Sequence, residues 1–340
     1  MKKPTVVYKN VENFSFDNAD VILYVQQNNP DDDHTVVNHL FRVHKAILSL
    51  HSHAFESMFL VPMPPVGSHS QQFHDGLLMF RMYDELKDVT DLLQTFYYPC
   101  SSAIIIPPHA SDTPIRLRGL LNIAHKYQVN QLYEHIVTFI KADWPQTLPR
   151  WDFLDDIDRQ RMLEPQTTLP WDPVLDDEQK MSEPAAAIHI AREFDIPEVL
   201  PAAFYHLARI EISCDYDEAR QDLCPRSEHA ARWGMLTPED MNCLMRGKEE
   251  IASIMGHFVN QTRSKCCHPC KSSWEETLFM TNYGRDPLEV LRRFIRRYEL
   301  CDVCRESLAT RAMVKREEIW FKLPEIFHLP VVPPWCTDHF

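Results

Sequence analysis

Between residues 19 and 59 the chain alternates apolar runs with polar breaks, in an order typical of a hairpin followed by two short helices. Residues 19–25 form an apolar, β-branched run that predicts a mostly buried strand, and a polar stretch separates it from a second short strand at 40–43. The apolar positions then change to helical spacing, first in 44–50 and again in 53–59. The sequence therefore predicts two paired strands and two short helices near its start.

Helical spacing dominates the remainder of the chain. A third strand is expected at 76–82 and a helix at 85–98, where Pro99 ends the pattern. Two helical pairs follow, at 117–144 and at 187–207, and their apolar positions match each other at one constant offset. Further amphipathic helices are expected toward the C-terminus. One begins near Thr237, and two others span 287–300 and 307–321.

An acidic, proline-rich stretch separates the two helical pairs. Residues 146–183 mix Pro and Trp with acids and show little apolar period, which predicts a linker whose carboxylates, such as Asp155, stay solvated. We therefore expect an α+β domain at 16–145 and an all-helical domain at 184–340. A leader with one short apolar patch at 6–8 precedes them and occupies residues 1–15.

Three of the N-terminal segments resemble the opening of a BTB/POZ domain. They are Asp-Val-Ile-Leu-Tyr-Val at 20–25, Phe-Arg-Val-His-Lys-Ala-Ile-Leu-Ser at 41–49, and Ser-His-Ala-Phe-Glu-Ser-Met-Phe at 52–59. The resemblance extends to about Pro145 and implies a small sheet flanked by helices that makes a homodimer or recruits a protein partner. No blade or finger repeats follow, so the layout is more similar to the fungal, basidiomycete-type BTB proteins than to the animal Kelch or zinc-finger types.

The resemblance also points to a charged pocket. In BTB domains that recruit partners through a dimer groove, an acid in the first strand and a base after a histidine line such a pocket. Here those positions hold Asp20 and Lys45. A structural role is the alternative, because Asp20 and His44 can satisfy each other and nearby backbone donors inside the fold. Two narrower functions stay open, a substrate adaptor of a cullin-type ubiquitin ligase and a transcription-associated scaffold.

Composition narrows the possible functions. A net charge of -14 argues against a duplex nucleic-acid binder, which needs clustered Lys and Arg. One arginine group is basic locally, and we expect a solvated helix face there rather than a phosphate site. It comprises Arg292, Arg293, Arg296 and Arg297. The chain has seven glycines and no phosphate-cradling loop, and no H-E-x-x-H, G-x-S-x-G or kinase-type motif occurs. We therefore expect no enzyme.

The N-terminus has two lysines but no apolar stretch of signal-peptide length, and no window approaches a membrane span. We therefore expect a cytoplasmic or nuclear protein whose ten cysteines are mostly reduced.

Four of those cysteines form two Cys-x-x-Cys pairs, Cys267 with Cys270 and Cys301 with Cys304. Each such pair turns its two sulfurs toward a common point, so two pairs predict one tetrahedral, structural zinc ion with no open position for water. The gap between the pairs is longer than in common zinc ribbons, and reduced cysteines filling a helical core are the alternative. Two spare ligands lie beside the first pair: Cys266 and His268.

Overall fold

The computed structural model describes most of the chain and divides it into two compact units. The residues it describes are 5–29, 32–61, 72–99, 112–163, 181–216, 230–265, 267, 270, 286–295, 300–330 and 335. The first unit comprises 1–107 with 115–138, and the second, called the helical unit below, comprises 108–114 with 139–340. The division falls within helix α5, which spans Asn130–Asp143.

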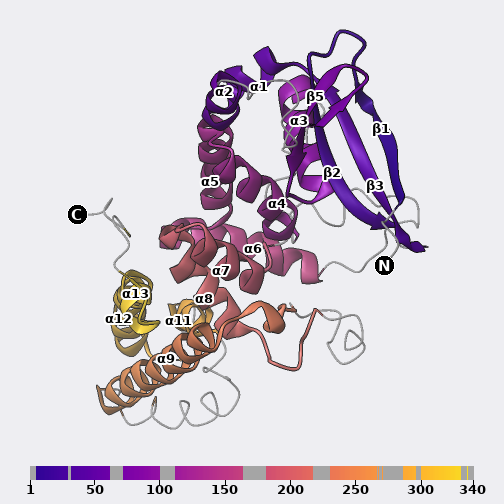
Figure 1. The fold of residues 1–340 in the computed structure, drawn as a ribbon. Coiled ribbons are helices and arrows are strands. Elements are labelled where there is room, and N and C mark those ends of the chain that lie inside the picture. The colour runs from indigo at the N-terminus through magenta and orange to yellow at the C-terminus, as the bar shows by residue number, and fades with distance from the viewer. Residues whose placement is uncertain are drawn as a thin grey trace. The chain divides into compact units, whose positions relative to one another are not determined.

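The first unit contains a five-stranded sheet in the order β1-β3-β2-β5-β4 (Figure 1). Its strands are β1 (Thr5–Ser15), β2 (Val21–Asn29), β3 (Asp32–Val43), β4 (Gln72–His74) and β5 (Leu77–Met82). Strand β2 runs antiparallel to β3 and parallel to β5, while β1 runs parallel to β3. The predicted hairpin is confirmed as β2 and β3, and the predicted third strand as β5. Both hairpin strands are longer than expected: β2 continues to Asn29 and β3 begins at Asp32, so the polar stretch predicted to separate them is largely paired.

The sheet is strongly curled. β1 and β4 stand at opposite ends of the strand order, yet the ring of Tyr8 on β1 lies 4.6 Å from that of His74 on β4. The turn from β4 to β5 consists of Asp75 and Gly76, both at positive φ (51° and 79°), as in the two-residue turns that suit the twist of paired strands. In β2, Val21 to Val25 are all buried, as expected for a strand covered on both faces.

Five helices accompany the sheet. They are α1 (Lys45–His51), α2 (His53–Leu60), α3 (Leu86–Tyr97), α4 (Thr113–Lys126) and α5. Ser52 ends α1 and begins α2: its hydroxyl accepts the Phe55 N–H at 3.1 Å and donates to the Tyr127 carbonyl at 2.6 Å. A residue 75 positions further along the chain is thereby tied to the start of α2. The predicted sequence of strands and helices is confirmed.

The segment predicted as a leader differs from that expectation. β1 begins at Thr5 and pairs with β3 from Thr5 to Asn10, so the sheet includes residues that we expected to precede the domain. The apolar patch at 6–8 was too short to indicate a strand, and the polar residues that follow it show no alternation that would reveal the length of β1.

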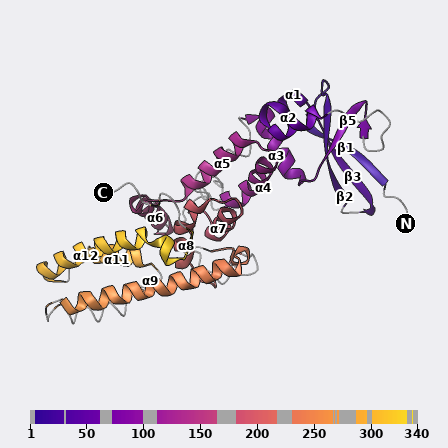
Figure 2. The same cartoon turned by 60° about the vertical axis from the view of Figure 1, so that its left-hand side comes forward.

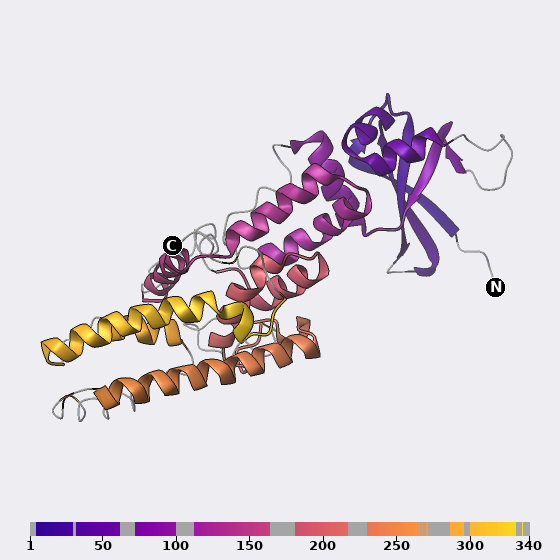
Figure 3. The same cartoon turned by 90° about the vertical axis from the view of Figure 1, so that its left-hand side faces the viewer.

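The helical unit follows α5. Its helices are α6 (Leu148–Leu163), α7 (Pro184–Glu193), η2 (Pro197–Val199), α8 (Leu200–Arg209), η4 (Trp233–Met235), α9 (Pro238–Lys265), α11 (Pro287–Ile295), α12 (Asp302–Phe321) and α13 (Leu323–Ile326). The second predicted helical pair is α7 and α8, both almost entirely buried. Figures 2 and 3 show α9 and α12 running side by side. An α+β first unit followed by a helical region confirms the predicted fold class.

The linker prediction for 146–183 is wrong over its first half. Residues 148–163 form α6, Trp151 is 1% exposed, and Asp155 and Asp158 are buried. Asp155 is not solvated, because it accepts hydrogen bonds from Arg159 at 2.8 Å and from Arg209 at 2.7 Å. The acids of α6 thus bind basic partners within the helical unit. The second half of the predicted linker, 164–180, lies outside the described residues.

The predicted arginine face is only partly solvated. Arg292 has a side chain that is 16% exposed, and it pairs with Asp156 and with Glu289. Arg293 is exposed and pairs with Glu289 at 2.9 Å. These guanidinium groups already have carboxylate partners, which leaves less charge for a phosphate. Arg296 and Arg297 lie outside the described residues.

None of the helices in the described part of the chain combines the length and the apolarity that crossing a bilayer requires.

Candidate partner surface and cysteine cluster

Asp20, His44 and Lys45 meet where β2 begins and α1 begins. The Asp20 carboxylate accepts the backbone N–H of Lys45, the first residue of α1, at 2.8 Å. A side chain from another element therefore satisfies an N–H that the helix itself leaves open. The Lys45 ammonium lies 5.8 Å from the centre of the Phe59 ring. Asp20 is exposed, so its carboxylate can also reach solvent.

His44 is held by partners that the sequence did not indicate. Its backbone N–H donates to the Tyr97 hydroxyl at 2.9 Å, and its ring Nδ1 lies 3.1 Å from the same oxygen. Its Nε2 lies 3.1 Å from the Asn18 side-chain oxygen. Burial raises the pKa of Tyr97, which keeps the hydroxyl neutral. His44 and Asp20 thus satisfy different groups and not each other. The sequence placed Tyr97 only within the helix predicted at 85–98, because a hydroxyl that pairs 53 positions away leaves no local pattern.

Strand β1 presents an exposed apolar stretch at the outer end of the sheet. Val6, Val7 and Tyr8 are 42%, 44% and 47% exposed. β1 pairs with β3 along one edge, and no other strand among the described residues pairs with its second edge. An outermost strand with apolar side chains is a template for pairing with another chain. This surface, Thr5 to Tyr8 on β1, is called the β1 edge below.

The four cysteines predicted as metal ligands do come together in the helical unit. Their sulfur atoms all lie within 4.8 Å of one another, close enough to hold a metal ion. Cys267 and Cys270 follow the end of α9, whereas Cys301 is the N-cap of α12 and Cys304 lies in its first turn. We call these four residues the cysteine cluster. The proposed spare ligands Cys266 and His268 lie outside the described residues.

The thiols of the cysteine cluster do not ionise alike. The backbone N–H of Cys301 alone would lower the pKa of Cys270, but the hydrogen bond with Cys267 and burial outweigh it and raise that pKa. The backbone N–H of Cys270 is the largest influence on Cys267 and, with the neighbouring thiols, lowers the pKa of Cys267 from its ordinary value to about 7. The backbone N–H of Cys301 lies 3.4 Å from the Cys270 sulfur. Cys301 and Cys304 also lie at a helix N-terminus, where negative charge is stabilised.

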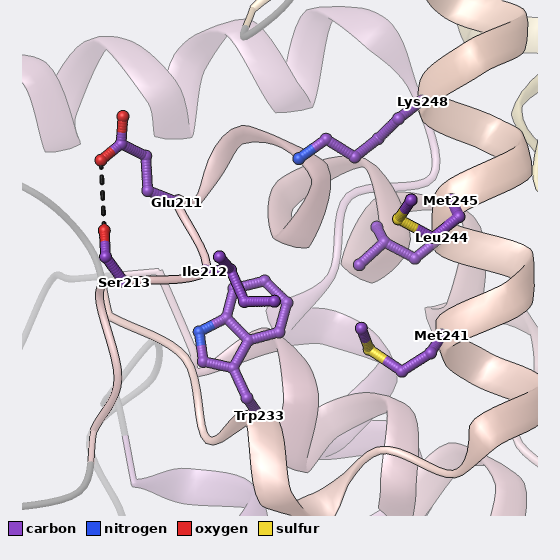
Figure 4. Close-up of a pocket in the computed structure, with 8 residues that line it drawn as sticks. All are labelled: Glu211, Ile212, Ser213, Trp233, Met241, Leu244, Met245 and Lys248. Carbon is purple, nitrogen blue, oxygen red and sulfur yellow. Dashed lines mark hydrogen bonds between the residues drawn. The ribbon is translucent and has the colours of Figure 1, made fainter.

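A concave surface lies between α9 and the segment that follows α8 (Figure 4). It encloses about 470 Å³ and is lined by Glu211, Ile212, Ser213, Trp233, Met241, Leu244, Met245 and Lys248. The four α9 residues are spaced so that they share one helix face. The sequence pattern contained that spacing, but it did not distinguish a pocket wall from a packed face. We call this surface the α9 pocket.

Lys248 is the unusual member of the α9 pocket. Figure 4 shows its ammonium pointing into the pocket above the side chains of Leu244 and Met245. The side chain is half-buried, and burial lowers its pKa. Within the described part of the chain the ammonium has neither a carboxylate nor a hydrogen-bond partner. A cation in this state binds an anion more favourably than a fully hydrated surface lysine does.

Comparison with known proteins identifies the domain that contains the curled sheet. Residues 12–143 match the family model of the BTB/POZ domain. No curated protein and no solved structure matches the chain. The placement among fungal BTB proteins therefore rests on the sequence layout alone. The match covers the curled sheet from the end of β1 onward and all five helices that accompany it. Residues 12–143 of this chain are a BTB/POZ domain.

Proposed function

We propose that this protein is an adaptor without catalytic activity, which self-associates through its BTB/POZ domain and binds a protein partner through its helical unit. BTB/POZ domains are protein-interaction modules, and the match at 12–143 supports that general role here. The expected domain limits, 16–145 and 184–340, are extended in the proposal: the first domain includes β1 from Thr5, and the helical unit includes α6. The proposal keeps a cytoplasmic or nuclear location. Any cofactor is a structural metal ion at the cysteine cluster, which takes no part in partner binding.

The observation that carries the proposal is the β1 edge. Pairing two copies of β1 would satisfy the backbone groups along the unpaired edge and remove Val6, Val7 and Tyr8 from water. Two identical strands that pair in an antiparallel sense form a two-fold interface, in which each residue meets its counterpart in the second copy. We therefore propose a homodimer.

Sedimentation velocity on the full chain tests the homodimer. At micromolar concentration the unaltered protein should sediment as a dimer. Val7→Asp should raise the Kd of the dimer by about tenfold or more, because each copy would then bring a carboxylate into the apolar interface between the paired strands. Val314→Asp is the matched control: Val314 is 58% exposed on α12 in the other unit, and its replacement should leave the dimer intact. A monomeric wild-type protein would rule the dimer out and shift the proposal to unlike partners.

For the second partner we propose the α9 pocket as the binding site. Its apolar walls fit an apolar side chain, and the ammonium of Lys248, which no carboxylate among the described residues pairs, favours a carboxylate beside it. The occupant is therefore a peptide segment in which Asp, Glu or a terminal carboxylate is adjacent to a large apolar residue.

A displayed library of random peptides checks this pocket. Peptides selected on the full chain should be enriched in an acidic residue next to an apolar one. Lys248→Glu should weaken their binding by at least tenfold through like-charge repulsion. Lys265→Glu, at the end of the same helix and outside the pocket, should have little effect. Selected peptides that lack acids, or that bind Lys248→Glu equally well, would count against the α9 pocket.

Two narrower roles fall within the proposed function. A substrate adaptor of a cullin-type ubiquitin ligase would co-purify with a cullin, whereas a transcription-associated scaffold would co-purify with DNA-bound factors. The net charge of -14 disfavours direct contact with DNA in either case. Affinity purification with mass spectrometry, compared between the unaltered chain and Asp20→Arg, would separate the roles and test whether the charged pocket contributes.

A further inference from the structure

The sulfur positions of the cysteine cluster have the dimensions of a metal site. Cys267 Sγ lies 3.8 Å from Cys301 Sγ and 3.8 Å from Cys304 Sγ. A tetrahedron of four sulfurs, each at about 2.3 Å from a central Zn²⁺, has edges of about 3.8 Å. A disulfide would instead need about 2.05 Å, and all four residues are free cysteines. The separations therefore fit four separate sulfurs around one ion.

The burial of the cluster argues against simple core packing. Cys270 and Cys304 are buried, but Cys267 and Cys301 are exposed. A cysteine that only fills a core is stabilised by burying its sulfur among apolar side chains. The two exposed thiols of the cluster gain little in this way, yet they lie against the two buried ones. A tetrahedral ion needs four sulfurs around one point, and here each Cys-x-x-Cys pair supplies two of them from its own segment of the chain.

Neighbouring groups already stabilise bound thiolates. The N–H of Cys301 is positioned at 3.4 Å from Cys270 Sγ, as an outer-shell donor would be. The N-terminus of α12 contributes positive potential at Cys301 and Cys304. Together these donors offset part of the negative charge that four thiolates bring to one divalent cation.

We propose that the cysteine cluster binds one Zn²⁺ through Cys267, Cys270, Cys301 and Cys304. This inference is independent of the proposed function. Four thiolates in a tetrahedron select zinc or iron among common metals, and zinc is the redox-inert choice for a closed site. With four protein ligands no position is left for water, so the ion is structural.

The ion would link the end of α9 to the start of α12. Between these helices the described contacts near the cluster are few: Arg311 donates to the Gln261 side chain at 3.3 Å and lies 5.6 Å from the centre of the Phe258 ring. Metal binding to a site that is absent in the unfolded chain contributes directly to folding free energy. The bound ion would therefore stabilise the contact between the C-terminal end of α9 and the N-terminal end of α12, where few side chains pack between the two helices.

Metal analysis of the full chain, purified without chelator, tests the site. We expect one zinc per chain, and Cys304→Ser should lose it. Cys243→Ser is the matched control, because Cys243 is a free, partly buried cysteine on α9 outside the cluster, and that variant should keep its zinc. Because Cys304→Ser could fail to fold, Cys267→Ser serves as a second variant at an exposed ligand, with folding checked by circular dichroism.

Cobalt provides a readout besides metal content. Co²⁺ added to the metal-free full chain should give the intense absorption of tetrahedral thiolate-bound cobalt, and Cys267→Ser should weaken it while leaving the helical signal of the folded protein. Iron in place of zinc, no metal at all, equal zinc loss in Cys243→Ser, or cobalt bound without thiolate absorption would each overturn the proposal. The sedimentation and peptide results are independent of these outcomes.

Discussion

Replacing Gly247 by alanine should lower the free energy of unfolding of the helical unit by about 3 kcal/mol. A Cβ atom at this position in α9 would lie 2.0 Å and 2.2 Å from two carbons of the Phe327 ring. That ring follows α13, is 0% exposed, and stacks on Phe204 with centroids 5.6 Å apart. It therefore cannot move aside without opening the packing between α13, α8 and α9.

Gly256→Ala in the same helix is the control for this experiment. Apart from the adjacent backbone of α9 itself, no atom of the described residues lies within 4 Å of a Cβ built at Gly256, so that substitution should stabilise the protein by about 0.5–1 kcal/mol through helix propensity alone. Thermal unfolding should show the contrast, with Tm falling by roughly 6–12 °C in Gly247→Ala and rising slightly in Gly256→Ala. Equal behaviour of the two variants would mean that Phe327 does not pack on α9 as described.

Local pattern was sufficient for most of the first unit. The start of β2 and the end of β3 are apolar runs, and α1 and α2 show helical spacing that Ser52 interrupts, so these parts could be predicted from a window of a few residues. The polar halves of β2 and β3 could not, because they carry no apolar alternation that distinguishes them from a loop. β4 could not, because three residues of mixed polarity carry no period. The Asp75-Gly76 turn beside it is a hairpin signal that the sequence did contain.

The candidate sites were predictable to different degrees. The cysteine cluster could be predicted, because the two short spacings require each pair to face one point, although more than thirty positions separate Cys267 from Cys301. The α9 pocket could not be, since its wall depends on how Trp233 and Ile212 approach Lys248 and its neighbours. A pattern of apolar positions identifies a helix face, but it does not say whether that face is filled.

Helix α6 shows most clearly what a local sequence pattern cannot predict. Its acids were predicted to be solvated because residues 146–183 mix Pro and Trp with acids and show little apolar period. One partner of Asp155 is local, since Arg159 lies four positions away on the same helix. The others are distant: Arg209 is 54 positions from Asp155, and Asp286, which binds Arg159, is 127 positions from that arginine. Charge pairs formed at such separations leave no periodic trace, so an acidic run in a buried helix resembles a linker.

These same residues make a four-charge cluster that holds α6, α8 and the start of α11 together. Arg209 lies 2.7 Å from an Asp155 oxygen and 3.0 Å from an Asp286 oxygen, and its side chain is 13% exposed. Arg159 binds the same two carboxylates, at 2.8 Å and 2.6 Å. Burial alone would lower the pKa of Arg209, but Asp286 and Asp155 outweigh it and raise that pKa, so the guanidinium stays charged.

Arg209→Met should therefore destabilise the helical unit by about 3–5 kcal/mol. Methionine retains much of the apolar contact with Trp151, whose ring centre lies 5.2 Å from the guanidinium carbon, but it leaves two carboxylates to share Arg159. Removing one partner of a buried ion pair lowers stability by more than the intact pair contributes to it, because the remaining charge stays buried without a partner. Urea unfolding at neutral pH measures the loss.

Two further variants separate this mechanism from a loss of packing. Lys322→Met removes a cation from an exposed pair with Glu318, at 3.3 Å, and should cost about 0–1 kcal/mol. Adding Asp155→Asn to Arg209→Met removes one of the stranded charges, so the double variant should be more stable than the sum of the two single losses predicts. Strictly additive losses would show that Arg209 acts through packing on Trp151 and not through its carboxylates.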